Sequence, residues 1–471
     1  MSFEGPDPRR WRALALLGTA QLMLILDVTV VAIALPHMGA DLGLSRASLT
    51  WVVSAYTLVF GGLMLLGGRA ADLFGARRLV LAGLLVFTAA SLVTGLAGSA
   101  SVLIGGRVAQ GVGAALLSPA ALSMVTKLFQ GAELHRALGV WSGLGGGGAA
   151  LGVLLGGALT AGPGWPWVFY VNVPIGLLVV AALVWALPAD PPVRGGARLD
   201  VPGALLVTAG TGALIYALIN AGDAGWGAPR TVVALAAAAL LYGAFVLLQR
   251  RSRQPLMNPG IVARRPVAAG LFMILVATAL MIAVFFLGSF YLQHLRGYGA
   301  LRTGLLFLPV AVATIAGAHL AGSLVGRRGT RAVAVAGLAV AGLGAAAPAV
   351  WAGPAALIAG ITVAAAGVGA VFVAASTSAL SQVRPDEAGV TSGILSTFHE
   401  FGASLGVAVV SSIAAASIAG TTDTGFTNAF TFAAVTAVVA GGLAAVVVPP
   451  HRPAPVPTDE PQPVLPRSET A

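Results

Sequence analysis

The chain has 471 residues, of which 58% are hydrophobic and only 9% are charged, against roughly 25% charged residues in ordinary soluble domains. A soluble core cannot bury that much apolar surface, so the composition excludes an ordinary soluble protein and predicts an all-α integral membrane protein. The formal net charge of +10 forms no basic stripe with aromatic platforms, so no nucleic-acid partner is expected. The absence of cysteine excludes disulfides and thiolate-bound metals.

Apolar stretches of roughly 20 residues, the length needed to cross a bilayer as a helix, follow one another along nearly the whole chain. The first stretch is too long for the apolar part of a cleavable signal and is expected to be retained. The Pro-rich tail 449–471 is expected to be disordered. Breaking the chain at charged, Pro and Gly clusters predicts fourteen spans, at residues 12–35, 49–71, 79–98, 102–126, 136–160, 167–188, 201–221, 229–249, 266–291, 303–325, 331–350, 354–380, 391–418 and 427–448.

The basic residues divide unevenly between the two sets of predicted loops. With the N-tail 1–11 placed in the cytoplasm, most of the 26 Lys and Arg residues fall in the tails and the even-numbered loops. The opposite loops hold Arg46, Arg230, Arg296 and Arg302. This bias is the positive-inside pattern and predicts a multi-pass protein with both termini in the cytoplasm. The abundance of Arg over Lys and the high Ala and Gly content suggest a GC-rich bacterial genome, and the expected location is the bacterial inner membrane.

One charged loop occurs twice in the chain. The first copy, after the second span, contains Gly68, Asp72, Gly75, Arg77 and Arg78. The second copy, 322–331, repeats the two glycines and the first arginine at the same spacing, with Gly326 in place of the acid. This recurrence predicts two six-helix bundles, 12–188 and 266–448, with two inserted helices and their flanking loops in 189–265.

The first copy of the loop is predicted to be a conformational gate at the cytoplasmic face. Its glycines allow helix ends to approach closely and to adopt positive φ. Asp72 is expected to act against Arg77, Arg78 or Arg136, and only the first bundle has the acid needed for this pairing. The alternative is that the arginines simply orient the loop and Asp72 offsets their charge.

Asp27 and Arg107 are charged residues inside predicted spans. A carboxylate in a span costs roughly 2.5–3.5 kcal/mol unless it is paired, hydrated or protonated. Asp27 lies about 12 Å, and Arg107 about 8 Å, from the outer ends of their spans, so the two side chains are expected at similar depth. Gln110 follows Arg107 on the same helix face. We expect this group to couple protons, and the alternative is a static buried ion pair.

Glu400 is a second candidate proton or cation site. It lies roughly 15 Å into the thirteenth span, near the middle of the bilayer. His399 points about 100° away around the helix and is not expected to share its role. His319 in the tenth span is a weaker candidate, because a lone histidine there is more often an interhelical hydrogen-bond donor.

The fifth span is unusually rich in glycine. Its nine glycines include Gly143, Gly145, Gly152, Gly156 and Gly157, and the pairs 139/143, 143/147, 148/152 and 152/156 are four residues apart. Small residues at this spacing permit close contact between helix backbones, and many glycines favour bending. The alternative to a bending, functional helix is ordinary tight packing.

Together these motifs resemble the major facilitator superfamily, and in detail its fourteen-helix drug:proton antiporter family (EmrB/QacA type). The fifth span resembles the antiporter motif of exporters, although Val153 stands where that motif usually has proline, and Ala32 and Pro166 replace a usual Asn and a common Arg. The other stretches that carry the resemblance are Leu26–Pro36, Gly68–Leu79, Arg107–Gly113, Trp165–Gly176, Tyr291–Gln293 with Gly297–Tyr298, and Gly304 with Pro309.

The resemblance implies the major facilitator fold and a proton-coupled exporter that works by alternating access. Its expected substrates are amphipathic or lipophilic, often cationic, drugs or toxic compounds, so the protein would contribute to antibiotic resistance. No enzyme activity, metal or cofactor beyond the proton gradient is expected, and the protein is expected to work as a monomer. A phosphate-binding G-x-x-x-x-G-K-[ST] loop is absent, which argues against ATP as the energy source.

Three alternatives to this function stay open. The first is a dedicated exporter of one metabolite or antibiotic. The second is a proton-coupled importer, which the Gly-rich fifth span disfavours. The third is a membrane sensor or scaffold that transports nothing, against which the charges inside the spans argue.

Overall fold

The computed structural model describes residues 9–129, 131–187, 199–252, 255–257, 259–351, 353–381, 383, 387–418 and 424–449. The predicted disorder of the C-terminal tail concerns residues outside this part. Twelve of the described helices are long and apolar enough to cross a membrane. The elements are α1 (Arg9–Leu42), α2 (Arg46–Phe74), α3 (Ala76–Gly95), α4 (Ala100–Leu128), α5 (Gly131–Ala161), α6 (Trp167–Tyr170), α7 (Asn172–Ala186), α8 (Val201–Ala224), α9 (Pro229–Arg251), α10 (Pro259–Val262), α11 (Arg265–Phe290), the π-helix η1 (Tyr291–Leu295), α12 (Ala300–Val350), α13 (Pro354–Leu380), α14 (Ala388–Ile413), α15 (Ala415–Ile418) and α16 (Thr424–Val447).

Two differences from the predicted spans concern α5 and α12. Within α5, only Leu151–Ala161 qualifies as a shorter apolar helix among the described residues. α12 runs through both predicted spans 303–325 and 331–350 as one 51-residue element, interrupted at Gly329 by φ 80° and ψ 158°. The structure therefore supports an all-helical membrane protein of about twelve apolar helices, and the count of fourteen stays a prediction.

The helix boundaries follow from local side chains. Ser45 accepts a hydrogen bond from the backbone N–H of Ser48 at the start of α2, and Ser99 does the same for Val102 at the start of α4. Asp200 caps α8 through the N–H of Gly203. These oxygens satisfy N–H groups that have no partner within the helix.

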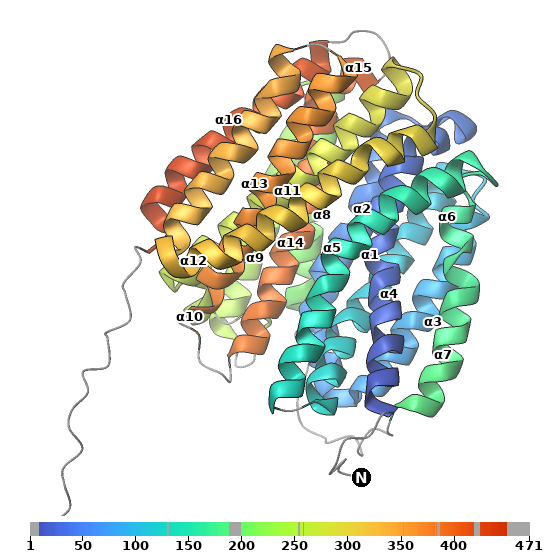
Figure 1. Cartoon of the computed structure of the whole chain (residues 1–471), viewed down its shortest axis with the longest axis vertical. Coiled ribbons are helices and arrows are strands. Elements are labelled where there is room, and N and C mark those ends of the chain that lie inside the picture. The colour runs from blue at the N-terminus through green and yellow to red at the C-terminus, as the bar shows by residue number, and fades with distance from the viewer. Residues whose placement is uncertain are drawn as a thin grey trace, which may run out of the picture.

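The helices fall into two groups by packing. Helices α1 to α7 pack mainly on one another, and so do α11 to α16. The groups meet where α2 packs on α14 and where α5 packs on α12. In Figure 1 they lie closest at the end opposite the N-terminus and separate toward the N-terminal end.

Side-chain hydrogen bonds between the two groups lie toward the end opposite the N-terminus. In α1, Pro36 has no N–H to offer the carbonyl of Ala32 four residues earlier. The Ser289 hydroxyl of α11 donates to that carbonyl at 2.9 Å, and the Gln293 amide donates to the Ile33 carbonyl at 2.9 Å. A proline-freed carbonyl of one group is thus satisfied by the other group.

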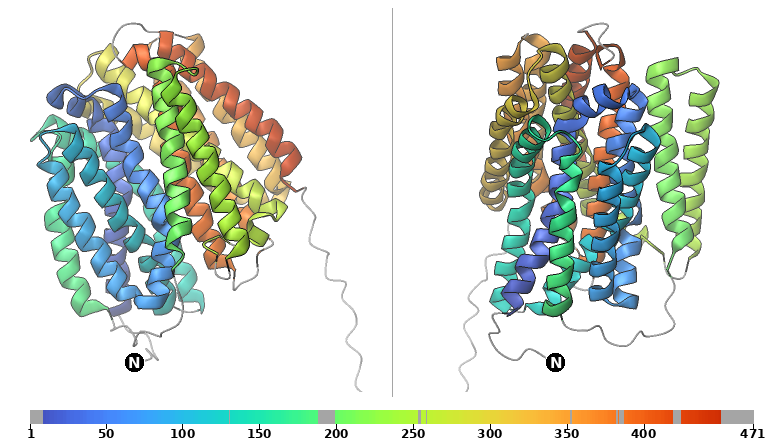
Figure 2. Two further views of the ribbon diagram at one scale, coloured as in Figure 1. Left: turned by 180° about the vertical axis from the view of Figure 1, so that it is seen from behind. Right: turned by 90° about the vertical axis from the view of Figure 1, so that its right-hand side faces the viewer.

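Helices α8 and α9 form a pair beside the two groups (Figure 2). α8 packs on both α2 and α14, while α9 packs mainly on α8. The window of α9 that is apolar enough to span a membrane is only 17% buried. α8 is therefore the member of this pair that contacts both groups.

Candidate functional site

Asp27 of α1 and Arg107 of α4 form a buried ion pair. The guanidinium NH1 of Arg107 donates to Asp27 Oδ2, and the exposed fractions of the two side chains are 1% for Arg107 and 0% for Asp27. The structure thus brings together the two charges that the sequence places inside spans. Because both lie in a low-dielectric interior, removing one would leave an unpaired buried charge.

Gln110 completes this pair. Its Nε2 donates to Asp27 Oδ1 at 3.0 Å and to Ser91 Oγ at 2.9 Å, while its Oε1 accepts from Arg107 at 3.0 Å. Arg107 Nε also donates to the Val52 carbonyl at 2.9 Å. Each oxygen of Asp27 therefore has a donor, and the network ties α1, α2, α3 and α4 together.

Tyr56 of α2 packs against this network. The Arg107 guanidinium carbon lies 4.3 Å from the centre of the Tyr56 ring, which is fully buried, and the Tyr56 hydroxyl donates to the Leu24 carbonyl at 3.4 Å. A cation over an aromatic face is stabilised by the ring quadrupole, most strongly where water is excluded. Tyr56 also lies within electrostatic reach of Asp27 and of Glu400 in the second group.

Glu400 of α14 faces α2, and its carboxylate has no charged partner among the described residues. A Cβ added at Gly61 of α2 would lie 2.6 Å from Glu400 Cβ, so the glycine admits this side chain. Glu400 is 9% exposed, and no described residue forms an ion pair or hydrogen bond with its carboxylate. Such a carboxylate is left to a proton, water or a cationic ligand.

The two histidines near this region differ in environment. His399 Nδ1 forms a 2.9 Å hydrogen bond with the Thr278 hydroxyl of α11, and its ring lies 5.7 Å from that of Phe372. It therefore points away from Glu400 toward its own group of helices. His319 on α12 is exposed.

The first copy of the repeated loop is built around Gly75. This residue links α2 to α3 with φ 102°, a conformation that favours glycine, whereas Gly68 lies within α2. The close approach to α4 belongs to Gly67, where an added Cβ would collide with the Ala115 carbonyl. At Gly68 the nearest atom to such a Cβ is 3.5 Å away.

The predicted charge cluster is not assembled in this conformation. Asp72 and Arg136 are both exposed, and within the described residues Asp72 forms no ion pair with Arg77, Arg78 or Arg136. Arg77 instead donates to the Val184 carbonyl of α7 at 2.6 Å, and Arg78 donates to the Phe74 carbonyl at 3.3 Å.

The second copy of the loop has the same geometry. Gly329 has φ 80°, and Arg331 donates through Nε to the Val448 carbonyl at 2.7 Å, just after α16. Arg77 likewise reaches the C-terminal part of α7. In each copy, an arginine two residues after a positive-φ glycine binds a carbonyl at the end of the last long helix of its group, where helix carbonyls lack partners.

The glycines of α5 lie between two neighbours. An added Cβ at Gly152 would collide with Thr29 of α1, and one at Gly156 would lie 3.0 Å from Val30 of α1. An added Cβ at Gly157 would instead lie 2.9 Å from the Ala300 carbonyl of α12. This helix therefore packs closely on its own group along one face and on the other group along another. What surrounds Gly143 and Gly145 lies outside the part of the structure that is described.

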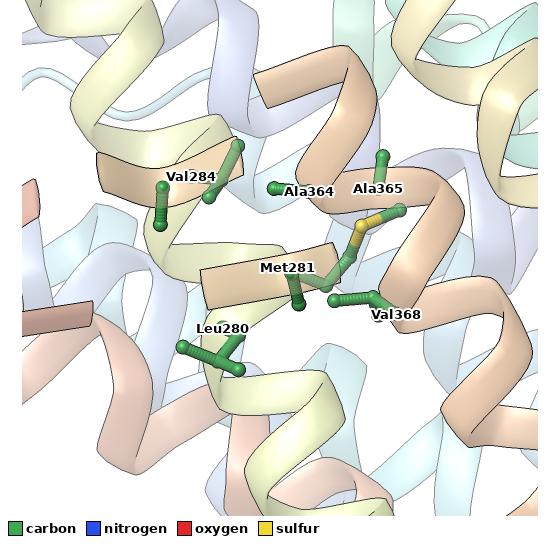
Figure 3. Close-up of a pocket in the computed structure, with 8 residues that line it drawn as sticks. Leu280, Met281, Val284, Ala364, Ala365 and Val368 are labelled. Carbon is green, nitrogen blue, oxygen red and sulfur yellow. The ribbon is translucent and has the colours of Figure 1, made fainter. Parts of the chain in front are cut away.

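A small pocket lies in the second group between α11, α12 and α13 (Figure 3). The pocket is lined by Leu280, Met281, Val284, Ala341, Ala345, Ala364, Ala365 and Val368. It contains no polar lining, so it offers neither a hydrogen bond nor a charge to a ligand.

Within the described residues, no three His, Asp or Glu side chains gather where they would hold a metal ion.

Sequence reasoning did not single out Tyr56 or Ser91. Both lie among other buried hydroxyl residues of α2 and α3, and neither belongs to the quoted motifs. A partial signal exists for Tyr56, because a tyrosine hydroxyl buried in a span needs a hydrogen-bond acceptor. Which acceptor it finds depends on how α1, α2 and α4 pack.

A buried ion pair inside the spans of a helical membrane protein is typical of membrane transporters. The sequence profile of the Major Facilitator Superfamily matches residues 17–407 and, in a second match, 312–469. The chain belongs to the Major Facilitator Superfamily.

The relatives of the chain include antibiotic resistance and export proteins. A puromycin resistance protein of Streptomyces alboniger is 38% identical over 421 residues, covering 87% of this chain and 83% of the relative. A cephamycin export protein of Amycolatopsis lactamdurans is 37% identical, covering 87% and 86%. A lincomycin resistance protein of Streptomyces lincolnensis is 35% identical, covering 94% and 92%. The chain is thus a transporter, not an enzyme, with drug-export relatives.

Solved structures share the fold at low sequence identity. A bacterial homologue of the human lysosomal transporter Spinster, inward-facing and unoccupied, matches with a TM-score of 0.67 and 18% identity, covering 94% of this chain and 98% of that one. An auto-inhibited peptide transporter of the POT family matches with a TM-score of 0.65 and 17% identity, covering 94% and 97%. These likenesses concern the fold.

Proposed function

We propose that this protein exports amphipathic drugs or toxic compounds in exchange for protons by alternating access, as a member of the fourteen-helix drug:proton antiporter type. The observation that carries the proposal is the buried Asp27–Arg107–Gln110 network. Charged residues are costly to bury inside a membrane span, and those that occur there usually mark an ion or substrate path. No cofactor other than the proton gradient is invoked.

The fourteen spans follow if α5 crosses the membrane and α12 crosses it twice around Gly329. α5 is 31 residues long, and the interruption at Gly329 divides the 51 residues of α12 into two pieces, each long enough to span. The bundles would then be 12–188 and 266–448, with the inserted pair in 189–265. The basic-residue bias favours cytoplasmic termini, so the N-terminal end, where the groups separate, would face the cytoplasm.

Proton coupling would use the two carboxylates differently. In the present conformation Asp27 accepts hydrogen bonds from Arg107 and Gln110. A proton arriving on Asp27 would cancel its attraction for the guanidinium and free Arg107 to move. Glu400, which no described side chain neutralises, would take a second proton or the cationic group of a substrate. The transport unit would be a single chain.

The alternative of a dedicated exporter also has specific support. Three of the relatives described above are each named for one compound, puromycin, cephamycin or lincomycin. The two forms of export differ in substrate breadth, and the same coupling residues would serve both.

The test is substrate-driven proton movement in inside-out vesicles. Puromycin, lincomycin and ethidium are each added while a pH-sensitive dye reports a pre-formed gradient. An active substrate should dissipate the gradient. Asp27→Asn should abolish this response, and Glu400→Gln should reduce it at least about tenfold, the effect of about 1.4 kcal/mol.

Glu133→Gln is the matched control, because Glu133 is a partly exposed carboxylate paired with Arg10 at the start of α5. It should respond like the parent protein. Unchanged exchange in Asp27→Asn would remove Asp27 from the mechanism. A response to one compound alone would favour the dedicated exporter, and no coupled flux with any compound would favour a sensor.

A further inference from the structure

The inserted helix α8 is joined to both groups of helices by one arginine. Arg46, the first residue of α2, donates through Nε to Asp223 Oδ1 of α8 at 3.0 Å and through NH2 to the Ile219 carbonyl of α8 at 2.6 Å. Its NH1 donates to Ser411 Oγ of α14 at 3.0 Å. All three guanidinium nitrogens are used, and they reach α8 and α14, so this residue of α2 links helices from three parts of the fold.

The burial of this contact is unequal. The Arg46 side chain is only 8% exposed, whereas the Asp223 side chain is 52% exposed. The geometric match of a planar guanidinium to several acceptors makes such a contact specific. Arg46 is also one of the few basic residues in the predicted loops outside the cytoplasm. The positive-inside pattern therefore does not explain why a basic residue stands there.

The arginine lies at the end of a longer polar contact between α2 and α14. Thr50 and Ser411 hydroxyls are 2.6 Å apart, as are those of Thr57 and Ser404. The Ser54 hydroxyl donates to the Ser404 carbonyl at 3.2 Å. We call these five residues the α2–α14 seam.

Among the described residues, the hydrogen bonds between α8 and the seam helices lie at one end of the contact. At the end opposite the N-terminus, the Ser412 hydroxyl of α14 donates to the Leu218 carbonyl of α8. A Cβ added at Gly222 of α8 would lie 2.7 Å from Ser412 Cα. Further along, Leu58, Val207, Ile215, Ile219, Phe401 and Ala408 form an apolar cluster of α2, α8 and α14. Apolar contacts are non-directional, so the fixed geometry lies at the Arg46 end.

We propose that α8 is a clamp across the α2–α14 seam and that Arg46 is its positioning residue, holding the transporter closed at the end opposite the N-terminus. The proposal rests on the alternating-access mechanism proposed above, since that mechanism requires the seam to open at this end. The inserted pair then has a role in transport, because α8 stabilises one of the two conformations. Loss of Arg46 should shift the population toward the conformation that is open at this end.

The experiment uses the natural absence of cysteine in the chain. Thr57→Cys and Ser404→Cys are introduced together in the full-length protein, in membranes without substrate or gradient. The rate of disulfide formation on adding an oxidant reports the closed seam. Arg46→Ala should lose about 1.4 kcal/mol of closed-state stability, which lowers the closed-to-open ratio about tenfold and so slows the rate. Asp223→Ala should lower this ratio about threefold, because Arg46 keeps its Ser411 and Ile219 acceptors.

Arg302→Ala is the matched control. Arg302 lies near the start of α12 at the same end of the molecule, and it stacks on Tyr298 of its own group at 3.7 Å. This variant should cross-link at the parent rate. An Arg46→Ala variant that cross-links as fast as Arg302→Ala would overturn the clamp.

Should Arg46→Ala fail to fold, Asp223→Ala decides, because its truncation removes a half-exposed side chain; a parent-like rate would then overturn the proposal. Thermal unfolding in detergent checks that each variant is folded. Failure of the export proposal would leave the cross-linking result unchanged, since the assay needs neither substrate nor protons. If the protein exports substrate but Arg46→Ala leaves the cross-linking rate unchanged, the clamp proposal alone would be wrong.

Discussion

At the scale of residues, the two intramembrane carboxylates have opposite surroundings. Asp27 receives donors from Arg107 and Gln110 on its two oxygens, whereas Glu400 has no ionic or hydrogen-bond partner among the described side chains. Burial of a charge is tolerated only with compensation. The charge of Asp27 is therefore compensated by side chains of the protein, whereas Glu400 is left to a proton, water or a cationic ligand.

Tyr56 provides a residue-scale prediction about the support of Arg107. Tyr56→Phe keeps the ring under the guanidinium and loses only a 3.4 Å hydrogen bond, so stability should fall by less than about 1 kcal/mol. Tyr56→Leu also loses the cation–π contact, worth about 2 kcal/mol when desolvated, and should be clearly less stable. Thermal and denaturant unfolding in detergent compare the two. Equal losses would mean that the hydroxyl, not the ring, supports Arg107.

At the scale of elements, each copy of the repeated loop forms a turn and also caps the C-terminal end of a neighbouring helix. Gly75 and Gly329 supply the positive φ, and Arg77 and Arg331 bind carbonyls near the ends of α7 and α16. The repeat thus preserves a local geometry in both groups, which explains why the second copy needs no equivalent of Asp72.

The turn gives a prediction with an internal control. Gly75→Ala forces a Cβ into a left-handed conformation and should cost about 1–2 kcal/mol of stability. Gly68→Ala places its Cβ 3.5 Å from the nearest atom, an ordinary contact, and replaces a helical glycine. It should be neutral or stabilising by up to about 1 kcal/mol. Unfolding midpoints of the two variants measure the difference, and a Gly68→Ala variant that is the less stable of the two would contradict this account.

At the scale of the whole molecule, two groups of helices meet along α2–α14 and α5–α12. The side-chain hydrogen bonds described for the α2–α14 and α1–α11 contacts lie toward the end opposite the N-terminus. Polar contacts of this kind have definite geometry, so a rocking motion must break them together.

Locking the seam should therefore stop transport. In the cysteine-free chain, a disulfide between Thr57→Cys and Ser404→Cys joins two hydroxyl positions that are 2.6 Å apart. Oxidation should abolish substrate-driven proton movement in vesicles, and a reducing agent should restore it. A single Thr57→Cys variant under the same oxidant controls for side reactions. Full transport in the cross-linked protein would show that this seam need not open.

Much of the architecture was readable from local sequence. Apolar length predicts helices in a membrane because backbone groups must be satisfied within each span. Asp27 and Arg107 could be paired by depth alone, since helix rise converts residue number into distance. Gly75 was recognisable because few other residues adopt its φ.

Other features depended on packing between segments far apart in sequence. Asp72 was expected to meet Arg77, Arg78 or Arg136, yet in this conformation Arg77 reaches the Val184 carbonyl instead. The ends of long arginine side chains find whichever acceptor the neighbouring helix offers, and loop sequence does not specify that helix.

The sequence by itself determined the class of protein, its all-helical membrane architecture and the charges that need explanation, because burial cost and helix geometry are local properties. Only the tertiary structure decided which partners those charges meet. It placed Tyr56 beneath Arg107, left Glu400 facing Gly61 without an ionic or hydrogen-bond partner for its carboxylate among the described residues, and brought Arg46 to α8 and α14 together. The physical reason is that hydrogen bonds and ion pairs act over a few ångströms, and helix packing alone sets those distances.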